Sequence, residues 1–258
     1  MSWQEQITDF GYSTQGTIIT SLPSPKVVQA VYTEMLQGDQ LPALPQERLF
    51  IDSSTIDPLT SKSVADLASN TNNGTFVDAP VSGGVVGARA GTLTFMFGAP
   101  TSNDLLLHRI RSVLSLMGTK ALHMGEQGTG VCSKLANNYI LSINNIAVAE
   151  ALNMGQRCGL DLKVLSDMIK TSTGRCWPVE CNNPVPGIDR DAPASNGYEP
   201  GGTVGIIRKD LALAMAGAEG VGAHLTLAER ACQVYDEVEE SHSGRDLSVV
   251  YQWLQDRP

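Results

Sequence analysis

One lysine in the sequence stands where it could move a proton. Lys134 lies about one turn into a long helical pattern and is followed by Asn137 and Asn138. The positive end of a helix dipole and any burial both favour the neutral amine, and such an amine can exchange protons near neutral pH as a general acid or base. Asn138 shares the helical face of Lys134, where it can orient the amine or a substrate oxygen. A lysine whose charge reaches out to the surface is the alternative.

The second candidate for chemistry is the segment 78–84, Asp-Ala-Pro-Val-Ser-Gly-Gly, at the end of a strand pattern. Gly83 and Gly84 allow backbone N–H groups to face a ligand, and together with the Ser82 hydroxyl they could bind a carboxylate or carbonyl oxygen. An ordinary loop is the alternative. Ser82 is not expected to be a hydrolytic nucleophile, because the chain has no Gly-x-Ser-x-Gly motif.

The segment 125–130, Gly-Glu-Gln-Gly-Thr-Gly, lies between a strand pattern and a helical one, as a dinucleotide-binding turn does. Two details differ from that fingerprint. Ser133 occupies the position of the third glycine, and the acidic residue about 20 positions further on, Glu150, falls inside the helix. A phosphate-binding loop and a turn that caps the helix both stay open, and the pattern favours the turn.

Composition argues against several classes of partner. The 258 residues carry 18 Lys+Arg and 27 Asp+Glu, a formal net charge of −9. Nucleic acid and anionic membrane surfaces bind clusters of Lys and Arg, so neither is expected as a partner. No run approaches the roughly 18 apolar residues of a membrane span. The four histidines and five cysteines lack metal-ligand spacing, so no metal is expected and the cysteines are interpreted as reduced thiols.

Short apolar runs alternate with helical patterns as far as residue 124, and only helical patterns follow. The strand-like runs are 17–22, 48–53, 75–79, 92–97 and 119–124, and the helical patterns among them are 25–37, 58–70 and 102–116, with a glycine-rich loop at 79–92. The later helical patterns are 131–156, 161–171, 205–219, 224–239 and 246–256, with a proline-rich loop at 174–203. Strands that alternate with helices predict right-handed crossovers and a mainly parallel sheet.

These patterns predict two domains of different class. Residues 1–127 are expected to form an α/β domain with a Rossmann-like parallel sheet, and residues 128–258 an all-helical domain, the two joined by the long helix. Sites of open α/β sheets lie outside the carboxyl ends of the strands. The segment 78–84 is therefore expected at that edge of the sheet.

In this order the segments resemble the β-hydroxyacid dehydrogenases, most closely the 3-hydroxyisobutyrate dehydrogenases. The segments that carry the resemblance are 18–23 (IITSLP), 51–58 (IDSSTIDP), 78–84 (DAPVSGG), 128–138 (GTGVCSKLANN), 174–177 (GRCW), 183–187 (NPVPG) and 209–211 (KDL). The resemblance covers nearly the whole chain from about residue 16 onward.

The resemblance implies NAD-dependent oxidation of a small 3-hydroxy acid to its semialdehyde, a step of valine catabolism. It implies that Lys134 is the catalytic residue, which takes or stabilises the hydroxyl proton. The other residues that it implies are Ser82, Gly83, Gly84 and Asn138 for the substrate, and Leu22, Pro23, Thr55 and Lys209 for the cofactor. The cofactor would carry the hydride while the protein orients the substrate and excludes water.

Two features depart from the family pattern. Family members begin with a strand, a Gly-x-Gly-x-x-Gly turn and a helix before the segment that starts here at Thr17. The Rossmann-like sheet is therefore expected to be incomplete, and NAD binding to be weak or undetectable. Members usually carry an aromatic residue seven positions before the lysine of Lys-Asp-Leu, where this chain has Gly202.

These departures leave other interpretations open. The chain could be a non-catalytic dimerising or regulatory relative of such enzymes, or its reading frame could miss upstream coding sequence. As an enzyme, it is expected to form a homo-oligomer through the helical domain. The resemblance places it in the mitochondrial matrix if its source is eukaryotic, and in the cytoplasm otherwise.

Overall fold

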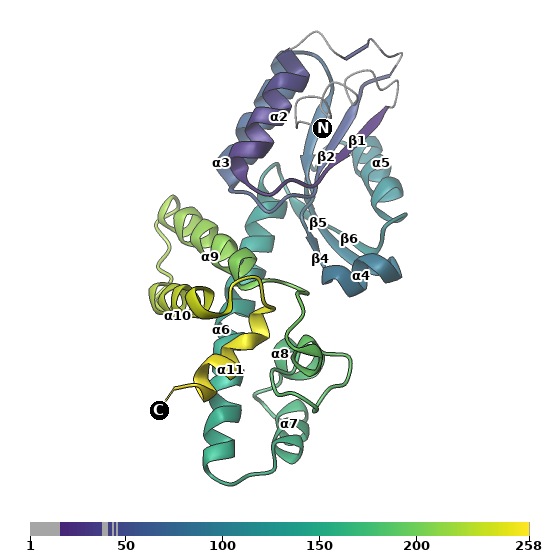
Figure 1. The fold of residues 1–258 in the computed structure, drawn as a ribbon. Helices are drawn as coiled ribbons and strands as arrows, with labels where there is room; N and C mark the ends of the chain where they lie inside the picture. Colours follow the sequence, from purple (N-terminus) through teal and green to yellow (C-terminus); the bar gives the residue numbers. More distant parts are fainter. Residues whose placement is uncertain (1–15, 38–40, 43, 45, 258) are drawn as a thin grey trace. The chain divides into compact units, whose positions relative to one another are not determined.

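The chain folds into two compact units, seen in a computed structural model that describes residues 16–37, 41, 42, 44 and 46–257 (Figure 1). The first unit ends at Leu135 and the second begins at Ala136, so the boundary falls inside one long helix, α6 (Thr129–Arg157). The first unit contains a sheet with flanking helices, and the second contains helices.

The first unit is a six-stranded, mainly parallel sheet. Its strands are β1 (Thr17–Thr20), β2 (Leu49–Asp52), β3 (Thr75–Asp78), β4 (Val81–Ser82), β5 (Leu93–Gly98) and β6 (Gly118–Gly125), in the order β1-β2-β3-β5-β4 with β6 also paired to β5. The pairs β1–β2, β2–β3 and β5–β6 are parallel, whereas β5 runs antiparallel to β3 and β4. The predicted parallel-dominated α/β fold is confirmed.

Helices cover both faces of this sheet because its central strands are apolar on both sides. The helices are α2 (Pro25–Gln37), α3 (Pro58–Asn70), α4 (Gly84–Ala90) and α5 (Asp104–Leu114). Figure 1 shows α2 and α3 on one face and α5 on the other. Phe50 of β2 packs in the core beneath α2 and α3, whereas its neighbours Leu49 and Ile51 belong to the core beneath α5.

The segment 79–92, expected to be a long loop, instead holds strand β4 and helix α4. After Ala79 and Pro80 the chain continues in the direction of β3, so that Val81 and Ser82 also pair with β5 in antiparallel register. Gly91 then ends α4 in the left-handed conformation, with φ of 65°. Sequence patterns miss such elements because β4 is too short to show alternation, and the glycines of α4 have poor helix propensity.

The second unit is helical, as predicted. After α6 come α7 (Leu162–Lys170), α8 (Trp177–Cys181), α9 (Val204–Glu219), α10 (Ala228–His242) and α11 (Val250–Gln255), with 3₁₀ turns at Pro193–Asn196 and Leu247–Val249. Beyond β6, the described residues pair as β-structure only in one isolated bridge, Thr203 with Asp246. The segment 174–203 was expected to be a loop, but α8 and a 3₁₀ turn lie within it because prolines are tolerated in first helical turns.

Hydrogen bonds from a buried tyrosine tie helix α10 to helix α6. The Tyr235 hydroxyl donates to the Ser142 carbonyl at 2.9 Å and accepts from Asn145 Nδ2 at 3.1 Å. The same amide donates to the Leu247 carbonyl at 2.9 Å. Three separate segments of the helical core are thereby held in register.

Three further structural findings bear on function. Among the described residues, none of the helices has the length and apolar character needed to cross a membrane. In the same part of the chain, no group of three or more His, Cys, Asp or Glu side chains is placed to hold a metal ion. All five cysteines are free thiols.

Candidate functional site

The carboxyl ends of three parallel strands meet at one edge of the sheet in the first unit. Strand β1 ends at Thr20, β2 at Asp52 and β3 at Asp78. Leu22 and Pro23 follow directly after β1, and the segment that begins at Ser53 follows β2. This edge is where open α/β sheets place their ligands.

A buried carboxylate, Asp52, organises the loops after β1 and β2. Its Oδ1 accepts hydrogen bonds from the Thr20 hydroxyl at 2.7 Å and from the Ser54 hydroxyl at 2.6 Å. The Leu22 backbone N–H in turn donates to the Ser54 hydroxyl oxygen at 2.7 Å. Burial raises the pKa of Asp52, and the hydrogen bonds from Ser54 and Thr20 partly oppose this rise. The loops after β1 and β2, which carry Leu22 and Thr55, are therefore held together by hydrogen bonds through the Asp52 and Ser54 side chains.

The residues predicted to bind a carboxylate lie after β3. Ser82 is half-buried at the end of β4, and Gly83 and Gly84 are exposed. Both glycines have positive φ, 133° and 60°, which few other residues adopt. The structure therefore places the Ser82 hydroxyl next to an exposed glycine backbone in the sequence.

Helix α6 begins against the carboxylate of Asp78 at the end of β3. Asp78 Oδ1 accepts from the Gly128 backbone N–H at 2.8 Å, and Oδ2 accepts from the Val131 backbone N–H at 2.9 Å. The segment 125–130 is therefore a helix-capping turn rather than a phosphate-binding loop, because the Gly128 amide within it and the Val131 amide directly after it serve this carboxylate. Lys134 is half-buried on α6, one turn beyond Val131.

The predicted site residues of the second unit are linked through a buried aspartate. Asn138 on α6 is buried and donates from Nδ2 to Asp210 Oδ2 at 2.6 Å. Asp210 Oδ1 forms an ion pair with Lys209 Nζ at 3.2 Å, and Asp210 itself is buried. The Asn138 side-chain oxygen accepts from Asn137 at 3.0 Å. The structure thus brings Asn138 and Lys209 together, two residues that the sequence only suggests separately.

Three aspartates that position these residues were not predicted from the sequence. Asp52, Asp78 and Asp210 are all almost fully buried and each holds a predicted site segment in place. Two of them share a sequence signal, since each is the last residue of an apolar strand, where a charge is costly unless it is hydrogen-bonded. Each of the three also has a partner at least 32 residues away in sequence, and local patterns do not show these distant partners.

The loop that precedes α9 explains why Gly202 fits this chain. The Gly202 backbone N–H donates to Asp246 Oδ2 at 3.0 Å, and a Cβ at this position would lie 3.3 Å from a methyl group of Leu247. A large side chain would therefore need the neighbouring segment to shift.

Two family models match consecutive parts of the chain. The model described as the NAD binding domain of 6-phosphogluconate dehydrogenase matches residues 1–125. The model described as NAD-binding of NADP-dependent 3-hydroxyisobutyrate dehydrogenase matches residues 128–254. The change from one model to the other coincides with the start of α6.

Similar proteins include several 3-hydroxyisobutyrate dehydrogenases. The mitochondrial enzyme of Drosophila melanogaster is 41% identical over 235 residues, which are 91% of this chain and 70% of that protein. The enzyme of Pseudomonas aeruginosa is 40% identical over 238 residues, 90% of this chain and 77% of that protein. The solved structure of the Mycobacterium tuberculosis enzyme with L-serine is 37% identical, with a TM-score of 0.85, and covers 96% of this chain and 82% of its own.

Identity of this size over nine-tenths of the chain, together with the same fold, settles the relationship. The chain belongs to the β-hydroxyacid dehydrogenase family, the NAD(P)-dependent oxidoreductases that include the 3-hydroxyisobutyrate dehydrogenases.

Proposed function

We propose that this protein oxidises a small 3-hydroxy acid, 3-hydroxyisobutyrate or a close analogue, to its semialdehyde with NAD as the cofactor. The observation that carries the proposal is the similarity to 3-hydroxyisobutyrate dehydrogenases at about 40% identity along nearly the whole chain. The L-serine bound to the Mycobacterium tuberculosis relative supports the substrate class. Like 3-hydroxyisobutyrate, L-serine is a short carboxylic acid with a hydroxyl on its third carbon.

In this proposal Lys134 handles the proton of the substrate. Its amine would take the proton from the hydroxyl oxygen as the carbonyl forms, which is general base catalysis. The position of Lys134 near the start of α6, half-buried and beyond a carboxylate-capped turn, supports this role. When bound, NAD(P) supplies the acceptor for the hydride.

The remaining residues would bind and orient the substrate. Ser82, Gly83 and Gly84 offer a hydroxyl and exposed backbone, which suit a carboxylate. Asn138 would orient the substrate through its second N–H, because one N–H already donates to Asp210. The buried aspartate fixes the amide orientation, and this leaves less freedom to lose when substrate binds.

The residues at the carboxyl edge of the sheet fit one end of the cofactor. Leu22 and Thr55 are half-buried and Pro23 is exposed, so apolar surface and a hydroxyl lie at the ends of adjacent parallel strands. We propose that they line the nicotinamide end of the cofactor and that Lys209 is a further cofactor-binding residue. The segment 125–130 does not fit the pyrophosphate, since Asp78 already accepts from the Gly128 amide and from the Val131 amide that follows the segment.

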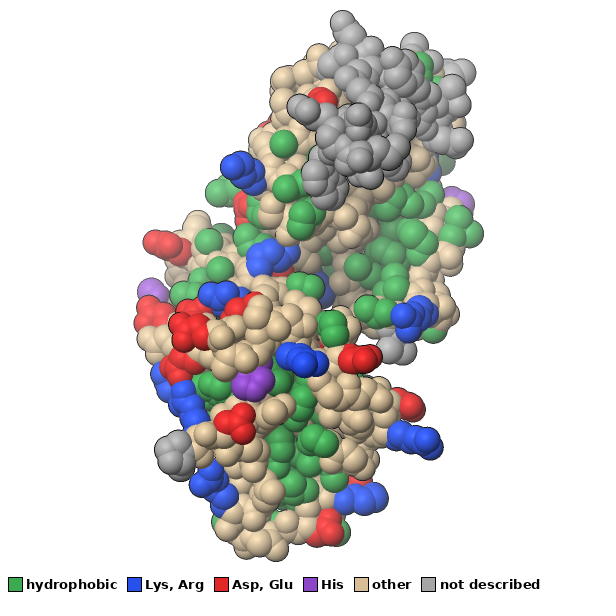
Figure 2. Space-filling model, viewed as in Figure 1, with side chains coloured by type: hydrophobic (Ala, Val, Ile, Leu, Met, Phe, Trp, Pro, Cys, Tyr) green, Lys and Arg blue, Asp and Glu red, His purple; other side chains and the backbone are tan. Residues whose placement is uncertain are grey.

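Two finer proposals concern assembly and location. We propose that the helical unit forms a homo-oligomer, because its surface exposes large apolar side chains, as Figure 2 shows. Those on α6 and α7 are Ile140, Met154, Val164 and Met168. Mitochondrial names among the eukaryotic relatives support the mitochondrial matrix as the location if the source is eukaryotic.

The proposed function is tested by turnover of 3-hydroxyisobutyrate with NAD or NADP, comparing Lys134→Ala with Lys163→Ala. Loss of the general base should lower kcat by about 10²–10⁴-fold. Lys163 is the matched control, since it lies in an exposed ion pair with Asp167 on α7. Turnover that survives Lys134→Ala would refute the role of this residue. A folded oligomer that neither binds the cofactor in calorimetry nor turns over any 3-hydroxy acid would favour a non-catalytic protein instead.

A further inference from the structure

We infer that Asp78 is a positioning residue for Lys134: its carboxylate fixes the first turn of helix α6 and thereby the place of the lysine amine. The inference rests on the proposed function, because it assigns to Asp78 a part in the proton transfer by Lys134. All residues that it uses belong to the first unit.

The carboxylate of Asp78 is surrounded by N–H donors. Besides the Gly128 and Val131 backbone groups, the side-chain amide of Gln127 donates to Oδ1 at 2.9 Å. The same amide donates to the Ser61 hydroxyl oxygen on α3, also at 2.9 Å. Asp78 therefore ties the start of α6 to the end of β3 from 50 residues away in sequence.

Both oxygens of the carboxylate are needed in this arrangement. The donors to Oδ1 are Gly128 and Gln127, and the donor to Oδ2 is Val131. An asparagine has one acceptor oxygen, so its NH₂ group would face an N–H group on one side or the other. Only an ionised carboxylate accepts hydrogen bonds at both oxygens. This arrangement therefore requires aspartate, whereas an ordinary helix cap can also be asparagine.

Two glycines allow the backbone to come this close to Asp78. A Cβ at Gly98 of β5 would lie 2.6 Å from Asp78 Oδ1, and one at Gly130 of α6 would lie 2.8 Å from Oδ2. The Cβ at Gly130 would also lie 2.4 Å from the carbonyl oxygen of Met96. Strand β5, the first turn of α6 and the Asp78 carboxylate are thus in direct contact. A shift of Asp78 must therefore move the first turn of α6.

Lys134 depends on this turn because it lies three residues beyond Val131 on the same helix. A displaced or frayed first turn would move the amine relative to the substrate. Misplacement of a catalytic group by about 1 Å can lower the rate on the order of 10²-fold. The effect should appear in kcat, because the groups proposed to bind the substrate carboxylate lie at the end of β4 and the start of α4, and not on the first turn of α6.

The electrostatics of this turn agree with the inference. Burial raises the pKa of Asp78 to about 6, and the backbone hydrogen bonds from Gly128 and Val131 oppose that rise. The carboxylate is therefore ionised at neutral pH. Its charge also reaches the next residue of the helix: burial raises the pKa of the Cys132 thiol, the charge of Asp78 raises it further, and Lys62 lowers it.

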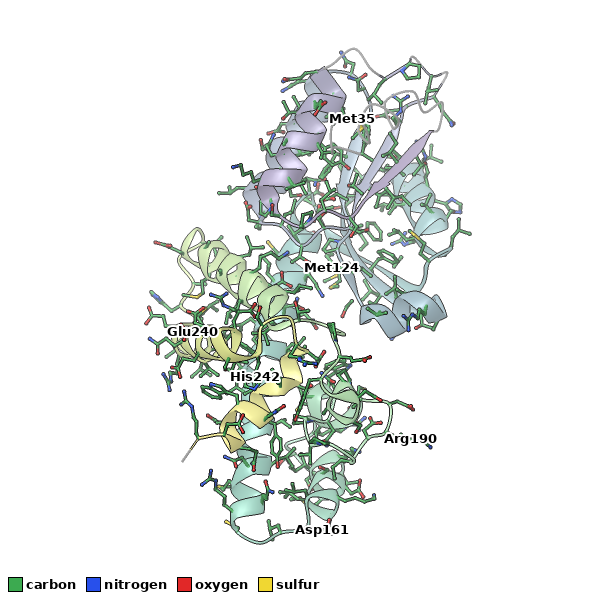
Figure 3. The ribbon with its side chains drawn as sticks, in the orientation of Figure 1. Met35, Met124, Asp161, Arg190, Glu240 and His242 are labelled. Carbon is green, nitrogen blue, oxygen red and sulfur yellow. The ribbon has the colours of Figure 1, made fainter. Side chains whose placement is uncertain are left out.

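The matched control is a second aspartate that caps a helix with two backbone hydrogen bonds. Asp161 lies at the start of α7 (Figure 3), and its Oδ1 accepts from the Lys163 and Val164 N–H groups at 2.8 and 3.0 Å. One oxygen suffices there, so Asp161→Asn should keep the cap. No proposed site residue lies on α7.

The experiment compares Asp78→Asn, Asp161→Asn and a milder variant, Gln127→Met, which removes one side-chain donor. Asp78→Asn should lower kcat by at least about tenfold with KM within about twofold, and Gln127→Met by about threefold in the same sense. Amide exchange at Val131 should become faster in Asp78→Asn, whereas Asp161→Asn should change neither kcat nor this exchange. If Asp78→Asn does not fold, Gln127→Met carries the test.

A readout independent of turnover separates this inference from the proposed function. The rate at which an acylating reagent modifies the Lys134 amine, followed by mass spectrometry, should change by at least about threefold in Asp78→Asn while the exposed Lys163 reacts as before. That result supports the positioning role even in a protein that turns over no hydroxy acid. Unchanged Lys134 reactivity together with faster Val131 exchange would overturn it, as would an unchanged kcat.

Discussion

Replacing Asp78 by asparagine should make the stability of the protein less dependent on pH. The carboxyl of Asp78 has a pKa of about 6 in the folded chain, compared with its ordinary value of 3.8, because it is buried. Between these two values the folded state keeps a proton that the unfolded state has released. The stabilising contribution of this group is therefore complete below about pH 4 and is lost as the pH rises through about 6.

A pKa difference from 3.8 to about 6 corresponds to about 3 kcal/mol. The wild-type free energy of unfolding should thus fall by up to about this amount between pH 4 and pH 7 relative to that of Asp78→Asn, whose amide does not titrate. Other carboxyls, such as the buried Asp52, contribute equally to both proteins and cancel in the difference. The free energy of unfolding of Asp78→Asn, relative to that of the wild type, should therefore be highest at neutral pH.

The assay is urea unfolding of both proteins at half-unit steps from pH 4 to pH 7.5, with the difference in free energy plotted against pH. A curve that changes by about 3 kcal/mol with its midpoint near pH 5 to 6 is expected. A flat difference would refute the reasoning, because it would mean that Asp78 has the same pKa in the folded and the unfolded chain. A change of opposite sign would mean that the hydrogen bonds outweigh burial.

Two substitutions test the packing that surrounds these features. Gly130→Ala should lower the free energy of unfolding by about 1–3 kcal/mol, because the new Cβ would lie 2.4 Å from the Met96 carbonyl oxygen. This clash should outweigh the better helix propensity of alanine. Chemical denaturation measures the change, and an unchanged denaturation midpoint would contradict the contact. Tyr235→Phe should lower it by about 1–3 kcal/mol, since the Ser142 carbonyl loses its buried donor, and a thermal midpoint equal to that of the wild type would count against this network.

The sequence predicts much of the fold, because its apolar runs are distinct. The strand patterns 48–53 and 75–79 contain β2 and β3, whose side chains are buried almost throughout. The elements within 79–92 and 174–203 were missed for a physical reason. They are short, contain glycine or proline, and owe their conformation to pairing with β5 or to packing rather than to local propensity.

The candidate site shows the limits of local patterns more sharply. Gly128 and Gly130 look like part of a dinucleotide fingerprint, yet one donates its amide to Asp78 and the other lets strand β5 approach the helix. The same residue types serve both purposes, because a close approach of backbone to an anion needs glycine whether the anion is a phosphate or a carboxylate. Only the three-dimensional structure shows which anion is present.

The stability and the activity of the protein should respond to pH in opposite directions. As the pH falls through about 6, the wild-type protein gains the stability contributed by protonated Asp78. Protonation also turns one acceptor oxygen into a donor that faces an N–H group, so the first turn of α6 should loosen and kcat should fall.

Burial raises the pKa of the neighbouring Cys132 thiol above its ordinary value and the charge of Asp78 raises it further, so this thiol does not titrate between pH 5 and 7. The pH profile of kcat should therefore show a limb near pH 6 in the wild type, absent from the residual activity of Asp78→Asn. If both proteins show the same limb, another group causes it and the carboxylate does not set the place of Lys134. A limb seen in the wild type alone would mean that the ionised Asp78 carboxylate is needed for activity, because the first turn of α6 requires both of its oxygens as acceptors. The protein would then keep this buried charge although it lowers the free energy of unfolding at neutral pH by about 3 kcal/mol.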